Sequence, residues 1–199
     1  GQWGIHHYPG TGKIYVGNAS SGVGECFSYA KVNNLPEIPK NSTVVGAFFR
    51  MYQREFSGSG SLSVKAYAPS ESNWMFLGSA VSYPDMDILG KVLDYQTVSG
   101  GTVSSMLEWD ITPAARTWHT DTSQNHGLVL LSELSGSSAV AAFAGYSTLN
   151  SYNAGQQPVY IVMYRNVVGL EDYYGYHTMS IGRAGSGYVQ DQTGNLTVC

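Results

Sequence analysis

The sequence contains few charged side chains. Charged residues make up 12% of its 199 residues, about half the share of roughly 25% that is usual in globular domains. Lys and Arg together number 10 against 14 Asp and Glu, which gives a formal net charge of -4. Proteins that bind nucleic acid or anionic lipid need clustered Lys and Arg to neutralise phosphates. We therefore expect neither nucleic acid nor a membrane surface as a partner.

Long apolar runs and cysteines are also scarce. No run approaches the ~20 apolar residues that span a bilayer, so we expect no membrane insertion. The two cysteines, Cys26 and Cys199, are too few for a disulfide framework and lack the spacing of a zinc site. The sequence begins with Gly1 and ends in a strand-like segment. These ends indicate a piece excised from a longer protein, and we expect such a domain to be monomeric.

Glycine and tyrosine are abundant instead, with 24 Gly and 15 Tyr. Short alternating segments, rich in β-branched and aromatic residues, are separated by turn residues along most of the chain, which is the pattern of strands. The predicted strands are Lys13–Asn18, Glu25–Val32, Thr43–Gln53, Ser61–Tyr67, Val103–Ile111, Gly127–Glu133, Ala139–Phe143 and Val159–Arg165. Strands of this number and length predict an all-β sandwich.

A single short helix is predicted at Thr112–Trp118. Thr112 is a suitable N-cap, and Pro113 suits the first helical position, where its missing N–H has no partner to lose. Trp118 is expected to close one end of the sandwich, and Trp109 to lie in the core. After Arg165 the chain becomes richer in Gly and Tyr, so we place a boundary between a sandwich at 1–165 and a C-terminal extension at 166–199.

Several stretches resemble a known family. Residues 107–118 read LEWDITPAARTW and residues 125–130 read NHGLVL. Together they resemble the W-D-(V/I)-T…W…N-x-G-L-x-L core of DNRLRE domains, which are secreted bacterial β-sandwiches related to carbohydrate-binding modules. Further pieces follow in the family's order, from IYVG at 14–17 to the crossover ending in VLDY at 92–95 and the closing strand PVYIVMY at 158–164. One departure is Gln157, where the family has Arg before the Pro.

The tail resembles a second pattern. Residues 169–176 read GLEDYYGY and residues 184–196 read AGSGYVQDQTGNL. Both are similar to the junction that follows such domains in very large Rhs/YD-repeat, wall-associated bacterial proteins. The resemblance implies a jelly-roll-like β-sandwich with one short helix and a C-terminal extension that leads toward a repeat region. It also implies a secreted or cell-surface location.

No catalytic constellation is recognisable in the sequence. The pair Asp85 and Asp87 is expected in a solvated loop, and two adjacent acidic residues of an extended tail, at 171 and 172, point to opposite faces. No serine lies in a G-x-S-x-G elbow, and the histidines lack the i,i+4 spacing of a helical metal site. We therefore expect no enzymatic activity, no transition metal and no cofactor.

Calcium is the alternative that the sequence leaves open. Loop carboxylates and backbone carbonyls are its usual ligands, and Asp85, Asp110 or Asp121 could contribute. An ion-free fold, in which Asp110 bonds to the start of the helix, is favoured because no EF-hand loop is present.

Aromatic side chains in predicted loops are the residues best able to bind a ligand. Trp74, Tyr83, Tyr146 and Tyr152 lie in or beside such loops, and sugar rings stack on exposed Trp and Tyr faces. We therefore expect a non-catalytic, carbohydrate-binding-like module whose partner is a glycan or cell-wall polymer. The alternative is a structural spacer that presents the repeat shell and has no ligand of its own.

Overall fold

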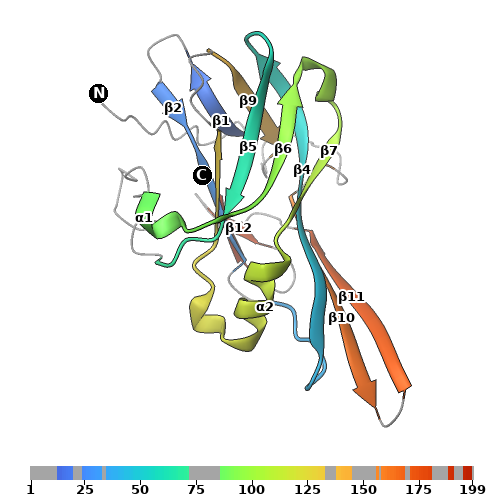
Figure 1. Ribbon diagram of the computed structural model, residues 1–199. Coiled ribbons are helices and arrows are strands. Elements are labelled where there is room, and N and C mark those ends of the chain that lie inside the picture. The colour runs from blue at the N-terminus through green and yellow to red at the C-terminus, as the bar shows by residue number, and fades with distance from the viewer. Residues whose placement is uncertain are drawn as a thin grey trace.

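The computed structural model is mostly β (Figure 1). It describes residues 13–19, 24–32, 35–71, 86–132, 138–144, 156, 158–168, 171–180, 188–190 and 195–198. The strands are β1 (Lys13–Ala19), β2 (Gly24–Cys26), β3 (Ser28–Val32), β4 (Thr43–Ser57), β5 (Ser61–Tyr67), β6 (Val92–Ser99), β7 (Met106–Asp110), β8 (Leu128–Ser132), β9 (Val140–Ala144), β10 (Val159–Val168), β11 (Glu171–Ser180), β12 (Tyr188–Gln190) and β13 (Asn195–Val198). The helices are α1 (Met86–Leu89) and α2 (Thr112–Thr120), with 3-10 turns at Gly100–Thr102 and Thr122–Gln124.

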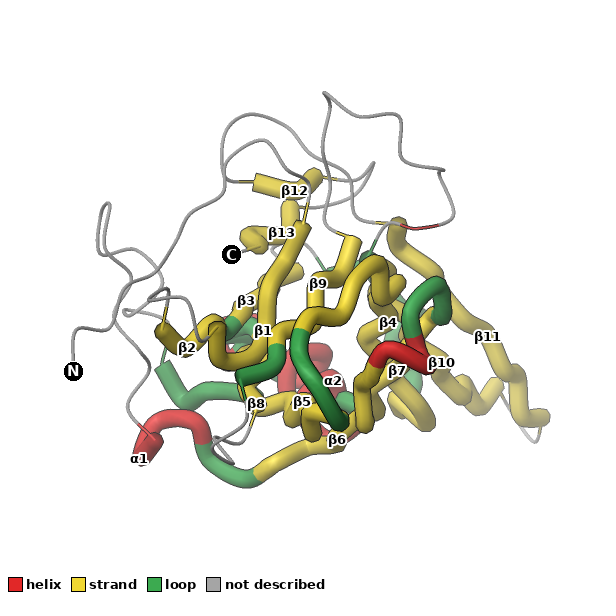
Figure 2. Tube along the Cα trace, turned by 90° about the horizontal axis from the view of Figure 1, so that it is seen from above, coloured by secondary structure: helices red, strands yellow, loops and turns green. Residues whose placement is uncertain are grey.

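The described strands form two antiparallel sheets. The first has the order β11-β10-β4-β9-β1-β2, and β7 also pairs with β4; the second has the order β12-β13-β3-β8-β5-β6. In the view from above, α2 lies beyond the strands, at the far end of the molecule (Figure 2). This confirms the expected mostly-β architecture with two sheets and a short helix, an arrangement consistent with a β-sandwich.

The chain passes from one sheet to the other at Phe27. The single strand expected at Glu25–Val32 is two strands, because β2 pairs with β1 in the first sheet and β3 pairs with β8 in the second. Immediately after the switch, Ser28 Oγ donates a hydrogen bond to the carbonyl oxygen of Tyr15 (2.9 Å). The buried hydroxyl thus ties the second sheet to β1.

The long strand β4 is the centre of the first sheet. It continues four residues beyond the predicted end at Gln53. Both β10 and β7 pair with residues 48–50, so they flank β4 on its two edges, and β9 pairs with its last residues. The register shifts at Val45 and at Arg54. Such bulges bend a strand and increase its twist, which lets the one long strand β4 pair with β10, β7 and β9 along its length.

The core contains both predicted tryptophans. Trp109 is fully buried, and its Nε1 donates to the carbonyl oxygen of Val64 (2.9 Å), so a β7 side chain bonds to a strand of the opposite sheet. The Trp109 ring meets Phe143 edge-on, with ring centroids 5.8 Å apart. Trp118 is buried on α2, which lies at one end of the two layers (Figure 1).

The helix start differs from the expected one. Thr112 is the first residue of α2, and Ile111, which precedes it, provides no side-chain cap. The Thr112 hydroxyl oxygen instead accepts a hydrogen bond from the N–H of Ala47 (2.9 Å). Its side chain therefore joins the helix to β4, while Pro113 occupies the first turn as predicted.

Strands also occur where none was predicted. These are β6, β11 and β12, whereas β13 coincides with the strand-like segment expected at the end of the sequence. The strand expected from Val103 begins only at Met106, because a 3-10 turn and a positive φ of 69° at Ser104 precede it. The boundary predicted near residue 166 falls within β10, and the division into domains stays a prediction. No helix among the described residues is long and apolar enough to cross a membrane.

Candidate functional site

The structure does not describe the aromatic residues that were predicted to bind a ligand. Trp74, Tyr83, Tyr146 and Tyr152 all lie outside the described residues. Their role in binding therefore stays a prediction, and a candidate site has to be built from the strands that the structure describes.

The predicted calcium ligands that are described serve local turns. The Asp110 Oδ1 accepts a hydrogen bond from the N–H of Thr112 (2.9 Å), which is the expected bond to the helix start. Asp121 Oδ1 accepts from the N–H and hydroxyl of Ser123 (3.0 and 2.6 Å), and these bonds lower the pKa of Asp121. Asp85 lies outside the described residues. In the described part of the chain no three His, Cys, Asp or Glu side chains gather as a metal site.

An exposed tyrosine lies on the outer face of the second sheet. Leu62, Val64 and Val98 are buried in the core, so the alternate residues of β5 and β6 point outward. The outward residues pair across the strands as Ser61 with Ser99, Ser63 with Thr97, and Lys65 with Tyr95. We call these six residues the β5–β6 face. Tyr95 is 60% exposed, so this face presents an aromatic ring beside hydroxyls and an ammonium group.

The strand that carries Tyr95 is held on both sides. Its β5 side is paired along the whole strand. On its other side, Gln96 Nε2 donates to the carbonyl oxygen of Glu108 (2.6 Å), and Asp94 Oδ2 accepts from the N–H of Asp110 (2.8 Å). Asp94 Oδ1 also accepts from the N–H of Tyr95 (2.8 Å). Side chains of β6 thus bond the edge of one sheet to the edge of the other.

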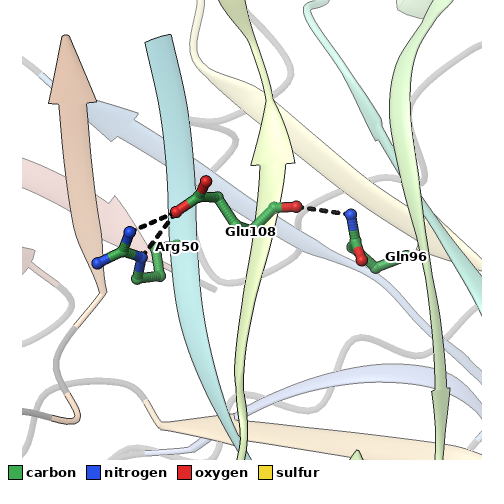
Figure 3. Close-up of polar contacts among 3 residues, drawn as sticks. All are labelled: Arg50, Gln96 and Glu108. Atoms are coloured by element: carbon green, nitrogen blue, oxygen red, sulfur yellow. Dashed lines mark hydrogen bonds and ion pairs between the residues drawn. The ribbon is translucent and has the colours of Figure 1, made fainter. Parts of the chain in front are cut away.

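An ion pair between Arg50 of β4 and Glu108 of β7 extends these contacts into the first sheet (Figure 3). Glu108 Oε2 accepts from Arg50 Nε (2.8 Å) and Nη2 (2.5 Å), while the Glu108 carbonyl accepts from Gln96. Both charged side chains are more than a third exposed, so the pair contributes at most about 1 kcal/mol to stability. Its main effect is to fix the position of β7 between β4 and β6.

A second cluster of polar rings lies where α2 meets the β10–β11 hairpin. His119 Nε2 and the Tyr160 hydroxyl are 3.1 Å apart, and their rings are stacked. Tyr164 stacks on His177 of β11, with ring centroids 5.8 Å apart. A Cβ at Gly175 would collide with the Tyr164 ring, so the ring covers the position that the missing side chain leaves open.

The pKa shifts of His119 and Tyr160 favour the neutral forms of these two side chains. Burial raises the pKa of the Tyr160 phenol well above its usual range. Burial lowers the pKa of His119, and the neighbouring His177 lowers it further. A neutral imidazole and a neutral phenol can share a hydrogen bond but hold no fixed charge for a ligand. The cluster therefore joins the helix to the hairpin, and the exposed β5–β6 face is the better candidate for a binding site.

Sequence reasoning did not single out Tyr95. Residues 92–95 were assigned to a crossover, and the aromatic candidates were sought in loops. The signal available was the alternation from Asp94 to Ser99, in which Val98 is the apolar inward residue and Tyr95 and Thr97 fall on the other face.

Comparison of the chain with protein-family models gives no match, and comparison with curated protein sequences gives none either.

Proposed function

We propose that the chain is a non-catalytic, carbohydrate-binding-like module of a secreted or surface-displayed bacterial protein, and that the β5–β6 face is part of its sugar-binding surface. Its fold is then a jelly-roll-like sandwich of the DNRLRE type, as the motifs at 107–130 imply. The partner is a glycan or cell-wall polymer. The observation that carries the proposal is the exposed Tyr95 ring on a strand fixed at both edges.

The chemistry of the face suits a sugar. A pyranose ring presents one apolar face of C–H groups and a rim of hydroxyls. An exposed Tyr ring can stack on the apolar face, and Ser and Thr hydroxyls can donate to or accept from the rim. Ser61 and Thr97 are exposed on either strand. Because the strand is rigid, little conformational entropy is lost when a sugar binds.

Binding to a polysaccharide panel tests the proposal. We expect a saturable interaction with at least one class among peptidoglycan, teichoic acid and plant or host glycans. Tyr95→Ala should weaken it by about tenfold, which corresponds to ~1.4 kcal/mol. Tyr174→Ala is the matched control, since Tyr174 is another exposed tyrosine, on the other sheet, and its loss should leave binding unchanged. Circular dichroism of both variants checks that they are folded.

The predicted loop residues form the second arm of this experiment. Trp74→Ala should also weaken binding if the loops extend the site, as should loss of Tyr83, Tyr146 or Tyr152. If a folded protein binds no polysaccharide class, the carbohydrate proposal is rejected. If it binds but Tyr95→Ala has no effect, the site lies elsewhere than the β5–β6 face.

A structural spacer is the second candidate function, and one observation favours it. Strand β13, near the end of the chain, pairs with β3 of the second sheet, and β12 pairs with β13. This pairing fixes the direction of β13 relative to the second sheet, which is what a spacer needs in order to orient a neighbouring domain. In this alternative the domain presents an Rhs/YD-repeat shell and binds no ligand.

A further inference from the structure

The outer edge of β11 is a long row of backbone groups. β11 has 10 residues, and its register with β10 runs without a shift from Glu171 to Ser180. It is the end strand of the first sheet, and none of the described strands pairs with its other edge. Figures 1 and 2 both place β11 at the outside of the molecule.

The hydrogen bonds of neighbouring strands show which backbone groups point outward. The N–H of Ile111 donates to the carbonyl oxygen of Ala47 (2.9 Å), so the backbone groups of Ala47 point toward β7. In an antiparallel sheet these directions alternate along a strand. The groups of Phe48 therefore point toward β10, and those of Ile161, its partner there, point back toward β4.

The same alternation continues into β11. Val162, next to Ile161, directs its backbone groups toward β11, where His177 is its partner. His177 and the other odd-numbered residues of β11 therefore bond to β10. The residues whose N–H and C=O point away from the sheet are Asp172, Tyr174, Tyr176, Thr178 and Ser180.

The edge of β7 in the same sheet shows what a protected edge looks like. There the carbonyl of Glu108 and the N–H of Asp110 are bonded by side chains of β6. Edge strands are otherwise blunted by Lys, Pro or bulges. The sequence of β11, EDYYGYHTMS, contains neither Lys nor Pro, and its pairing with β10 has no bulge.

Apolar side chains accompany the β11 edge. Tyr174 is 71% exposed, and Met163 on β10 is 36% exposed. Met163 pairs with Tyr176 and Tyr174 with Arg165, so Met163 and Tyr174 lie on the same face of the hairpin. Val45, the extra residue of the β4 bulge opposite Met163 and Tyr164 of β10, is also exposed. A partner strand on this edge would therefore also meet apolar surface.

We propose that β11 pairs edge to edge with β11 of a second copy of the chain, antiparallel across a two-fold axis. The two first sheets then form one continuous sheet, and the association replaces the monomer expected from the sequence. The proposal is independent of any glycan bound to the second sheet.

The charge distribution along β11 favours this occupant. Its carboxylates, Glu171 and Asp172, are both at the start of the strand, and its end carries hydroxyls. With the two-fold axis at Tyr176, Asp172 of one copy is opposite Ser180 of the other and Tyr174 is opposite Thr178. Antiparallel self-pairing thus keeps the acidic ends apart, whereas a parallel arrangement would place like charges side by side.

The oligomeric state as a function of concentration tests the proposal. We expect light scattering on a sizing column to show a mass that rises from 21.5 kDa toward twice that value as the concentration of the full chain increases. Thr178→Pro removes an outward N–H that β10 does not use, and Tyr174→Lys adds a charge to the edge. Both variants should stay monomeric. Tyr95→Lys, on the other sheet, is the matched control and should associate like the unchanged protein.

Hydrogen exchange locates the contact. The amides of Tyr174, Tyr176 and Thr178 should exchange slowly at high concentration and rapidly at low concentration, while that of His177 should stay protected at both. A protein that is monomeric at its highest soluble concentration overturns the proposal. So does association that Thr178→Pro and Tyr174→Lys, both folded by circular dichroism, leave unchanged.

Discussion

At the scale of single residues, Gln53 shows how a polar side chain can be placed in the core. It is fully buried on β4. Its Nε2 donates to the carbonyl of Ser99 (2.9 Å), and its Oε1 accepts from the hydroxyl of Thr102 (2.6 Å). Its backbone bonds to Ser104 and Ser105. All of its polar groups are satisfied, so the side chain fixes the turn after β6 against the bulge of β4.

Replacing this side chain should remove two hydrogen bonds from the core. Gln53→Leu keeps a similar volume but loses the bonds to the Ser99 carbonyl and the Thr102 hydroxyl, and we expect a loss of about 1–3 kcal/mol in the free energy of unfolding. Gln96→Leu is the control, because it removes a similar amide-to-carbonyl bond at a half-buried position where water can replace it. Urea denaturation measures both. Equal losses in the two variants would show that burial of the amide is not what makes Gln53 important.

At the scale of elements, the strands that obey simple alternation were predictable. Ser61–Tyr67 was predicted with its observed bounds, because its apolar residues alternate toward the core and it lies between a Gly/Ser segment and a proline. β6 was missed because Asp94 and Gln96 are inward residues that bond to β7 instead of packing in an apolar core. Tyr95 was missed with it. The split of residues 25–32 at Phe27 also depends on partners distant in sequence, which no local pattern contains.

The β10–β11 hairpin depends on one glycine. Because a Cβ at Gly175 would collide with the ring of Tyr164, Gly175→Ala should push that ring away from His177. We expect a loss of about 1–3 kcal/mol in the free energy of unfolding, as for other overpacked sites. In Gly100→Ala the new methyl group meets no atom within 4 Å, so that variant should be nearly neutral. If Gly175→Ala is as stable as the unchanged protein, the ring does not depend on the glycine.

At the scale of the whole molecule, two side-chain contacts hold separate parts together. The indole of Trp109 bonds the first sheet to the Val64 carbonyl of the second. His119 bonds α2 to Tyr160 of the hairpin. The first contact contains no titrating group near neutral pH, whereas the second does. The pH dependence of unfolding should therefore report on the junction between helix and hairpin.

The sign of that dependence follows from the His119 pKa. Burial, and then the neighbouring His177, lower it below the ordinary value of 6.5. The unfolded chain consequently binds a proton that the folded protein resists, so the free energy of unfolding should fall as the pH drops below about 6.5 and be unaffected by this group above it. Denaturation between pH 8 and pH 5 measures the effect.

His119→Gln isolates the contribution of this residue. The amide can still bond to the Tyr160 hydroxyl but does not titrate, so the decline between about pH 6.5 and 5 should become shallower. Asp121 does not affect this comparison. Its pKa is lowered from 3.8, so its contribution to the free energy of unfolding is lost only at more acidic pH. Identical pH profiles for the two proteins would mean that the folded state accepts the proton without strain. The charged imidazole would then donate a hydrogen bond to the Tyr160 hydroxyl, so the contact between helix and hairpin would survive protonation.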